Sequence, residues 1–175
     1  DGSAQVIDPL TVSDDSRSYG TRGLLGDSIR RDGGRVGYVW AGKGRAQLAN
    51  GAAAVADDGG TIDTVDIAGV GDDPDAAARR YVDADLILVE TRRSALTPST
   101  LAVSDVDRVV AAIDAHRRPT DTLIVLGLGH DARWHLSPLI LSEPGLRGTL
   151  GSDSTRRQGL MTMGDVSATV LNRLD

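Results

Sequence analysis

The chain has 175 residues, the length of one domain with one core, and with 3% aromatic residues and no phenylalanine that core must consist of Leu, Val, Ile and Ala. Its net charge is −6 and Lys43 is its only lysine, so the sequence lacks the basic stripe of a nucleic-acid binder and argues against that class. The absence of cysteine excludes disulfides and thiolate chemistry, and no apolar run is long enough to cross a bilayer, so we expect membrane association only through segments outside this sequence.

The first half of the chain alternates helix and strand signals. Val6-Ile7 predicts a strand end, and Thr21 can cap a helix that Gly33-Gly34 ends. The apolar face of this helix is predicted at Leu24, Leu25 and Ile29. After it we expect a strand at 35–40, a tight turn at 41–44, a helix at 45–56, a half-exposed strand at 61–67, a helix at 75–84 and a strand at 85–90. Because residues 85–90 are almost entirely apolar, that strand is predicted to be central.

The second half continues the alternation. A helix is predicted from Ser104, with His116 beside its C-terminal end, where the helix dipole favours a cation. Two apolar runs, 122–128 and 136–141, then flank a polar loop. A connection rich in glycine and serine, an extended piece at 160–163 and a last helix from about Asp165 complete the chain. The pattern predicts an α/β three-layer sandwich, with a mostly parallel central sheet and helices on both faces.

The polar loop carries the candidate metal ligands, His130, Asp131 and His135. A strand that ends in such a loop is where an α/β protein usually keeps its site. Imidazole and carboxylate groups suit zinc or manganese, so these three residues can hold one ion. Their spacing is loose, and ordinary loop hydrogen bonding is the simpler interpretation. No other cofactor is predicted.

Arginines form a second candidate site. Arg156 and Arg157 can bind an anion, because guanidinium groups pair bidentately with phosphate or sulfate. A solvated loop, or salt bridges to nearby aspartates, is the alternative. The turn at 40–45 contains Lys43 and can receive a phosphate, but it lacks P-loop spacing, which favours a plain turn. Ser167 and Thr169 have no histidine placed to activate them, so no nucleophile is assigned.

The C-terminal third resembles the closing segment of the alkaline phosphatase superfamily. The resemblance rests on the strand 139–141, on Pro144-Gly145, and on residues 165–171 (DVSATVL), where Ala168 replaces the family's proline. The run 154–160 (STRRQGL), and more weakly the sequence from Gly23 onward, is similar to uncharacterised secreted or membrane-anchored proteins of high-GC Gram-positive bacteria. The resemblance implies a truncated alkaline phosphatase-like fold and an extracytoplasmic location.

The departures from the family concern its metal site. Active members bind two metal ions through an aspartate after the first strand, an Asp-His pair and a histidine near the C-terminus, with a Ser or Thr nucleophile. Here residues 1–15 match no such opening, Gly129-His130-Asp131 reverses the Asp-His order, and no histidine follows His135. Three ligands on one loop cannot build a two-metal site.

We therefore predict a single domain over residues 1–175, part of a longer chain, that acts as a non-catalytic binding or scaffold module with a protein or cell-envelope partner. The alternative is a metal-dependent phosphoesterase or sulfatase-like hydrolase whose N-terminal metal and nucleophile segment lies outside this sequence. A third hypothesis, a nucleotide-binding protein, would require a ligand at 42–45.

Overall fold

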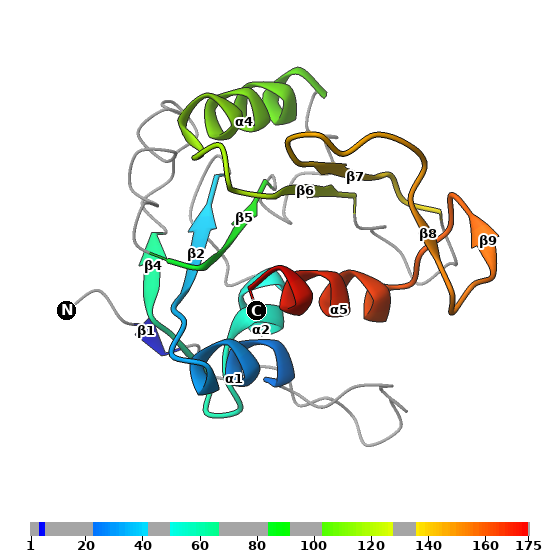
Figure 1. Ribbon diagram of the computed structural model, residues 1–175. Helices are drawn as coiled ribbons and strands as arrows, with labels where there is room; N and C mark the ends of the chain where they lie inside the picture. Colours follow the sequence, from blue (N-terminus) through cyan, green and yellow to red (C-terminus); the bar gives the residue numbers. More distant parts are fainter. Residues whose placement is uncertain are drawn as a thin grey trace. The chain divides into compact units, whose positions relative to one another are not determined.

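The computed structural model of the protein describes residues 4–5, 23–41, 50–66, 84–91, 103–127 and 136–174 (Figure 1). The fold is mixed α/β, as predicted, and the chain divides into two compact units, Asp1–Ile113 and Asp114–Arg173. The elements that begin in the first unit are β1 (Ala4–Gln5), α1 (Leu24–Arg31), β2 (Val36–Trp40), α2 (Asn50–Val55), β3 (Thr61–Ile62), β4 (Thr64–Asp66), β5 (Leu86–Glu90) and α4 (Val103–His116). Those of the second unit are β6 (Leu123–Leu126), β7 (Leu139–Ser142), β8 (Gly151–Ser152), β9 (Arg157–Gln158) and α5 (Met163–Leu174).

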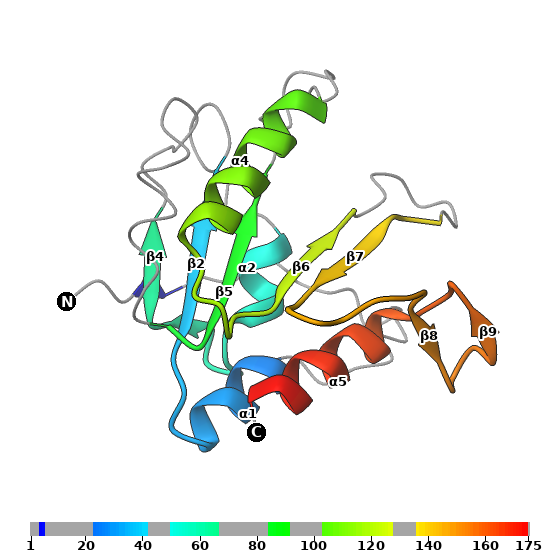
Figure 2. The ribbon, with the colours of Figure 1, turned by 45° about the horizontal axis from the view of Figure 1, so that its top comes forward.

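A parallel sheet in the order β4-β2-β5 organises the first unit (Figure 2). Tyr38 of β2 lies opposite Val65 of β4 on one side and Leu88 of β5 on the other. Within the described residues the middle strand is therefore β2, whose five residues are all buried, and the prediction that 85–90 forms the central strand is wrong. Strand β5 is half-buried along its whole length. Its apolar sequence predicted burial but contained no information on which strands lie beside it.

The predicted strand at 61–67 is divided at Asp63. The residues before the division form β3, which pairs antiparallel with β1, and those after it form β4, which pairs parallel with β2. The Asp63 carboxylate accepts a hydrogen bond from the Val36 N–H at 2.8 Å, at the start of β2. Residues 61–66 thus contribute a strand to each of two sheets, and Asp63 lies between the two strands.

The core of the first unit surrounds β2. Its buried apolar residues are Ile29, Val36, Tyr38, Val39, Trp40, Ala41, Ala52, Val55, Ala56, Ile62, Val109 and Ala112. Helix α1 packs on α2 through Gly26, where an added Cβ would lie 2.6 Å from the carbonyl oxygens of Val55 and Ala56. Leu24 was predicted on the buried face of this helix but is 54% exposed. The buried face instead carries Gly26 and Ile29, because only glycine permits so close an approach of the two helices.

The ends of α1 are set by glycines. The predicted cap at Thr21 is wrong, because the helix begins after Gly23, which has φ of 75° and makes no side-chain cap. At the other end, the Gly33 N–H donates to the Arg30 carbonyl and the Gly34 N–H to the Ile29 carbonyl, both at 2.9 Å. Gly33 has φ of 84°, so this is a Schellman ending, and the predicted stop at Gly33-Gly34 is confirmed.

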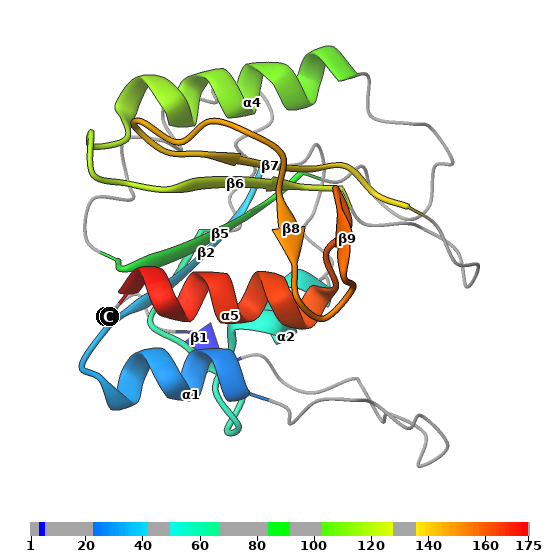
Figure 3. The same cartoon turned by 45° about the vertical axis from the view of Figure 1, so that its right-hand side comes forward.

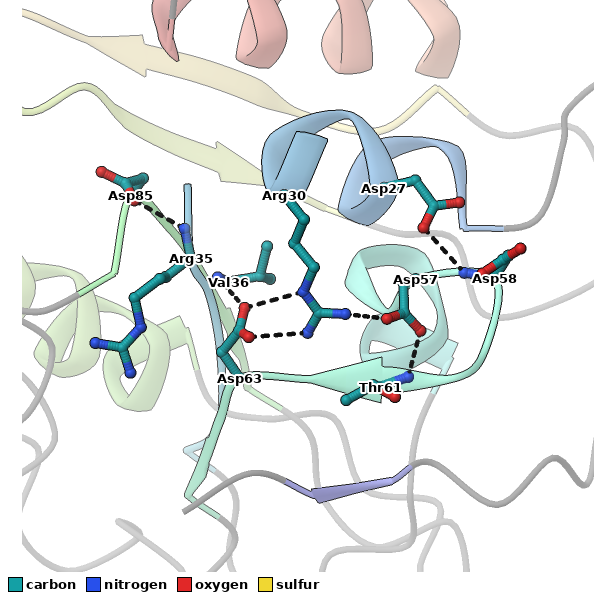
Figure 4. A network of polar contacts seen from close by, with 9 residues as sticks. All are labelled: Asp27, Arg30, Arg35, Val36, Asp57, Asp58, Thr61, Asp63 and Asp85. Carbon is teal, nitrogen blue, oxygen red and sulfur yellow. Dashed lines mark hydrogen bonds and ion pairs between the residues drawn. The ribbon is translucent and has the colours of Figure 1, made fainter. Parts of the chain in front are cut away.

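Arg30 connects α1 to the segment between α2 and β4 (Figure 4). Its guanidinium group pairs with Asp57 and with Asp63, whose Oδ1 lies 3.1 Å from Nη2. Asp57 also accepts from the Thr61 N–H at 2.6 Å. Burial alone would raise the pKa of Asp63, but the hydrogen bonds from Val36 and Arg30 hold it below its usual value. Both carboxylates accept hydrogen bonds, and the network joins residues that are 27 and 33 positions apart.

The second unit contains two antiparallel hairpins and a helix. Strands β6 and β7 pair with Ile124 opposite Leu141, so the two apolar runs of the sequence lie side by side but are half-exposed. Arg117 donates to the Ser142 carbonyl at 2.8 Å, and Arg173 of α5 pairs with Glu143 at 2.9 Å. Strands β8 and β9 form the second hairpin, beside the beginning of α5 (Figure 3).

The second hairpin corrects the prediction of an extended piece at 160–163. The strand pairing occurs earlier, with Ser152 opposite Arg157, and Met163 already belongs to α5. Residues of this hairpin are mostly polar, so they lack the alternation of apolar and polar residues by which strands are recognised.

Several predicted elements lie outside the described residues, namely the strand end at Val6-Ile7, the turn at 42–44, the first part of the helix at 45–56 and nearly all of the helix at 75–84.

The helix predicted from Ser104 is confirmed and is one residue longer, because α4 begins at Val103. The sheet that contains β2 is parallel, whereas β1–β3, β6–β7 and β8–β9 are antiparallel pairs. The three-layer sandwich and the single domain remain predictions.

Candidate functional site

The loop with the predicted metal ligands lies between β6 and β7. His130, Asp131 and His135 are themselves outside the described residues. The described residues on either side close the base of this loop, because the Gly127 N–H donates to the Pro138 carbonyl at 2.9 Å. The proposal of a metal site in this loop therefore keeps its sequence basis alone.

The predicted anion-binding arginines lie at the hairpin of the second unit. Arg156 is the last residue of the turn and Arg157 the first of β9, and both are exposed. Within the part of the chain that the structure describes, no carboxylate pairs with either guanidinium group. The Thr155 hydroxyl, beside them, donates to the Leu160 carbonyl at 2.8 Å.

Asp165 connects this hairpin to α5. Its Oδ2 accepts from the Thr162 N–H at 2.6 Å, from the Thr162 hydroxyl at 2.8 Å and from the Ser154 hydroxyl at 2.8 Å. The Asp165 N–H donates in return to Thr162 Oγ1 at 3.3 Å, which makes Thr162 and Asp165 a reciprocal capping box. The sequence prediction placed Asp165 at the start of the helix but missed this role, which the spacing Thr-x-x-Asp could have indicated.

These hydrogen bonds fix the charge of Asp165. The Thr162 N–H, followed by the hydroxyls of Thr162, Ser152 and Ser154, lowers the pKa of Asp165 to about 2. The carboxylate is therefore ionised at neutral pH and bonded to donors of its own unit. Ser167 and Thr169, further along α5, donate their hydroxyls to the carbonyls of Met163 and Asp165, as helix-bonded side chains do.

Polar side chains also occur where the parallel strands of the first unit end. Trp40 of β2 lies opposite Glu90 of β5, and the Tyr38 hydroxyl donates to Glu90 Oε2 at 3.1 Å. Burial, together with the Glu90 carboxylate, raises the pKa of Tyr38, so the phenol stays protonated. The indole Nε1 of Trp40 is buried and has no hydrogen-bond partner among the residues that the structure describes. The carboxyl ends of parallel strands are where α/β proteins bind ligands, but Lys43 and the rest of the following turn are outside the described residues.

The histidine predicted beside a helix end occupies that place. His116 is the last residue of α4, in the turn where the helix dipole favours a cation. The next arginine, Arg117, pairs with Asp114 of the same turn at 2.7 Å. This part of the chain therefore closes a helix, as the sequence indicated.

The described residues contain neither a metal-binding cluster nor a membrane-spanning helix. Among them, no three acidic or histidine side chains are grouped so that they could hold a metal ion. None of the described helices has both the length and the apolar character needed to cross a membrane. No family model, no curated protein and no solved structure matches the chain.

Proposed function

We propose that the chain is a non-catalytic domain of alkaline phosphatase-like fold, a three-layer sandwich that acts as an extracytoplasmic binding or scaffold module. The fold and the location come from the sequence resemblance at 139–171. The mixed α/β structure and the parallel order β4-β2-β5 are compatible with such a sandwich. The partner class that we propose is a protein or another component of the cell envelope.

The non-catalytic role rests on the departures of the sequence from the family's metal site, and the structure gives Asp165, in the matching segment, a purely structural role. This residue opens the DVSATVL run on which the resemblance depends. Its carboxylate is bonded to Thr162 and Ser154, so it caps a helix and links a hairpin. A carboxylate that is committed in this way stabilises the fold and would have to give up these donors before it could bind a metal ion or a substrate.

The competing function is a metal-dependent phosphoesterase or sulfatase-like hydrolase. One observation favours it: the bond between Gly127 and Pro138 closes the base of the loop that carries His130, Asp131 and His135. Because the described ends of the loop are joined, bringing three ligands together there would cost less chain entropy than it would between unjoined ends.

An ester hydrolysis assay distinguishes the two functions. The full chain is incubated with Zn²⁺, Mn²⁺ or Mg²⁺ and with nitrophenyl phosphate, bis-nitrophenyl phosphate or nitrophenyl sulfate. The matched control is the triple variant His130→Ala, Asp131→Ala, His135→Ala, prepared identically so that a contaminating phosphatase acts equally in both. We expect equal rates from the two proteins. A metal-dependent rate that only the unaltered chain shows would establish the hydrolase.

A further inference from the structure

The β8–β9 hairpin carries two consecutive exposed arginines, Arg156 and Arg157, on a backbone that is held by hydrogen bonds within the second unit. The Arg156 N–H donates to the Ser152 carbonyl at 3.0 Å, and the Gly159 N–H donates to the Leu150 carbonyl at 2.7 Å. Ser154, in the same turn, is bonded to Asp165 of α5. The turn is therefore fixed at both sides and at its centre, which keeps the backbone beneath Arg156 and Arg157 in one conformation.

Arg156 has an unusual backbone conformation for a residue with a side chain. Its φ is 54°, and it is the one residue other than glycine with a positive φ in the described part of the chain. Glycine would adopt this left-handed conformation without a steric cost, whereas a Cβ makes it unfavourable. Such strained residues are concentrated at functional sites, so an arginine here is better explained by its guanidinium group than by the turn.

The charges around the turn leave both guanidinium groups available. Four other arginines of the described residues, Arg30, Arg117, Arg118 and Arg173, each pair with an acidic side chain. Arg156 and Arg157 are exposed, and the acidic residue bonded to their turn, Asp165, accepts from Ser154 and Thr162 instead. Asp153, also in the turn and exposed, opposes an anion, so a ligand must contact both guanidinium groups to bind.

We propose that Arg156 and Arg157 form a site for a tetrahedral oxyanion, the phosphoryl or sulfuryl group of a ligand. A guanidinium group offers its N–H donors as a planar fork that matches two oxygens of such a group. Because both side chains are exposed and come from consecutive residues, we infer that both can contact one doubly charged group. This inference specifies the class of ligand that the proposed binding module would bind, and it rests on the proposed binding function. Hydrolysis in the ester assay would overturn the non-catalytic function and leave this site untouched, so the two can fail separately.

The test is a titration of the full ¹⁵N-labelled chain at constant ionic strength, followed by NMR at the Nε–H groups of its arginines. The probes are inorganic phosphate and sulfate, with acetate as the carboxylate control. We expect saturable shifts of the Arg156 and Arg157 signals with phosphate, sulfate or both, and the tighter of the two identifies the phosphoryl or sulfuryl class. Acetate is expected to bind more weakly than either.

Variants separate the site from general charge effects. Arg156→Gly removes the guanidinium group and also relieves the left-handed strain, so it should fold, and we expect it to weaken binding by about tenfold. Arg157→Gln should weaken it similarly. Arg31→Gln is the matched control, since Arg31 is exposed at the end of α1, and it should change the affinity by less than about twofold. Equal weakening by all three variants, no saturable shift, or equal affinity for acetate would overturn the proposal.

Discussion

Asp165 shows how one residue connects two elements of the second unit. Its hydrogen bonds with Thr162 cap α5, and its hydrogen bond from Ser154 holds the β8–β9 hairpin to that cap. The lowered pKa follows from these donors, because each of them stabilises the ionised carboxylate. The same residue therefore determines both where the helix begins and how the arginine turn is supported.

The pKa of Asp165 can be measured by NMR through the pH dependence of its carboxyl carbon. We expect a value of about 2, against the ordinary 3.8. Because the pKa is lowered by folding, the stabilising contribution of this carboxylate is complete above pH 3.8 and is lost as the pH falls through about 2. Thr162→Val, which removes one donor and the helix cap, should raise the pKa toward 3.8.

The control for this measurement is Ser167→Ala, which removes a hydroxyl from the same helix. That hydroxyl donates to the Met163 carbonyl and not to the Asp165 carboxylate. It should leave the pKa of Asp165 unchanged. An ordinary pKa in the unaltered chain would mean that the capping box and the Ser154 bond do not form in solution.

Between elements, the packing of α1 on α2 depends on a glycine. Gly26 faces the backbone of Val55 and Ala56, which cannot rotate away as a side chain could. Gly26→Ala should destabilise the fold by about 1–3 kcal/mol, because overpacking a close contact outweighs the better helix propensity of alanine. Urea unfolding of the full chain measures this difference.

A helical glycine elsewhere provides the matched control. Gly164 lies in the first turn of α5, where an added Cβ would meet the Thr162 Oγ1 at 3.6 Å, an ordinary contact. Gly164→Ala should be neutral, or stabilising by up to about 1 kcal/mol, from helix propensity alone. If both variants stabilise the protein, the close approach of the two helices is incorrect.

The sequence predicted elements better than it predicted their partners. Strand β2 and helix α4 appear within one residue of their predicted bounds, because an apolar run and a 3.6-residue periodicity are local signals. Which strand is central, and which pairs are antiparallel, depends on contacts between distant residues. The pairs of Arg30 with Asp57 and Asp63 are of this kind, and no local pattern contains them.

For the candidate site as well, the sequence predicted the residues but not their conformation. Arg156 and Arg157 were identified from the chemistry of guanidinium groups, without knowledge of the turn. The left-handed conformation of Arg156 could not be predicted, since the residues that favour it are glycine and asparagine. His130, Asp131 and His135 remain a hypothesis from sequence.

At the scale of the whole molecule, the two units contain different structural features. The first contains the parallel sheet, with Glu90 bonded to Tyr38 at the ends of its strands. The second contains the loop of predicted metal ligands, the arginine turn and Asp165. The proposed function therefore depends chiefly on the second unit, because both of its candidate ligands, a metal ion and an oxyanion, would bind there.

The most direct measurement of the non-catalytic role is the metal content of the purified full chain, with thermal unfolding in the presence and absence of Zn²⁺, Mn²⁺ and Mg²⁺. A metal that binds the folded chain stabilises it by about 2.7 kcal/mol at a hundredfold excess over its Kd. We predict that the purified chain contains no stoichiometric metal. We also predict that each ion changes the unfolding temperature of the chain no more than it changes that of the variant with alanine at His130, Asp131 and His135. A bound metal, with a stabilisation that the triple variant loses, would contradict the account and support the hydrolase.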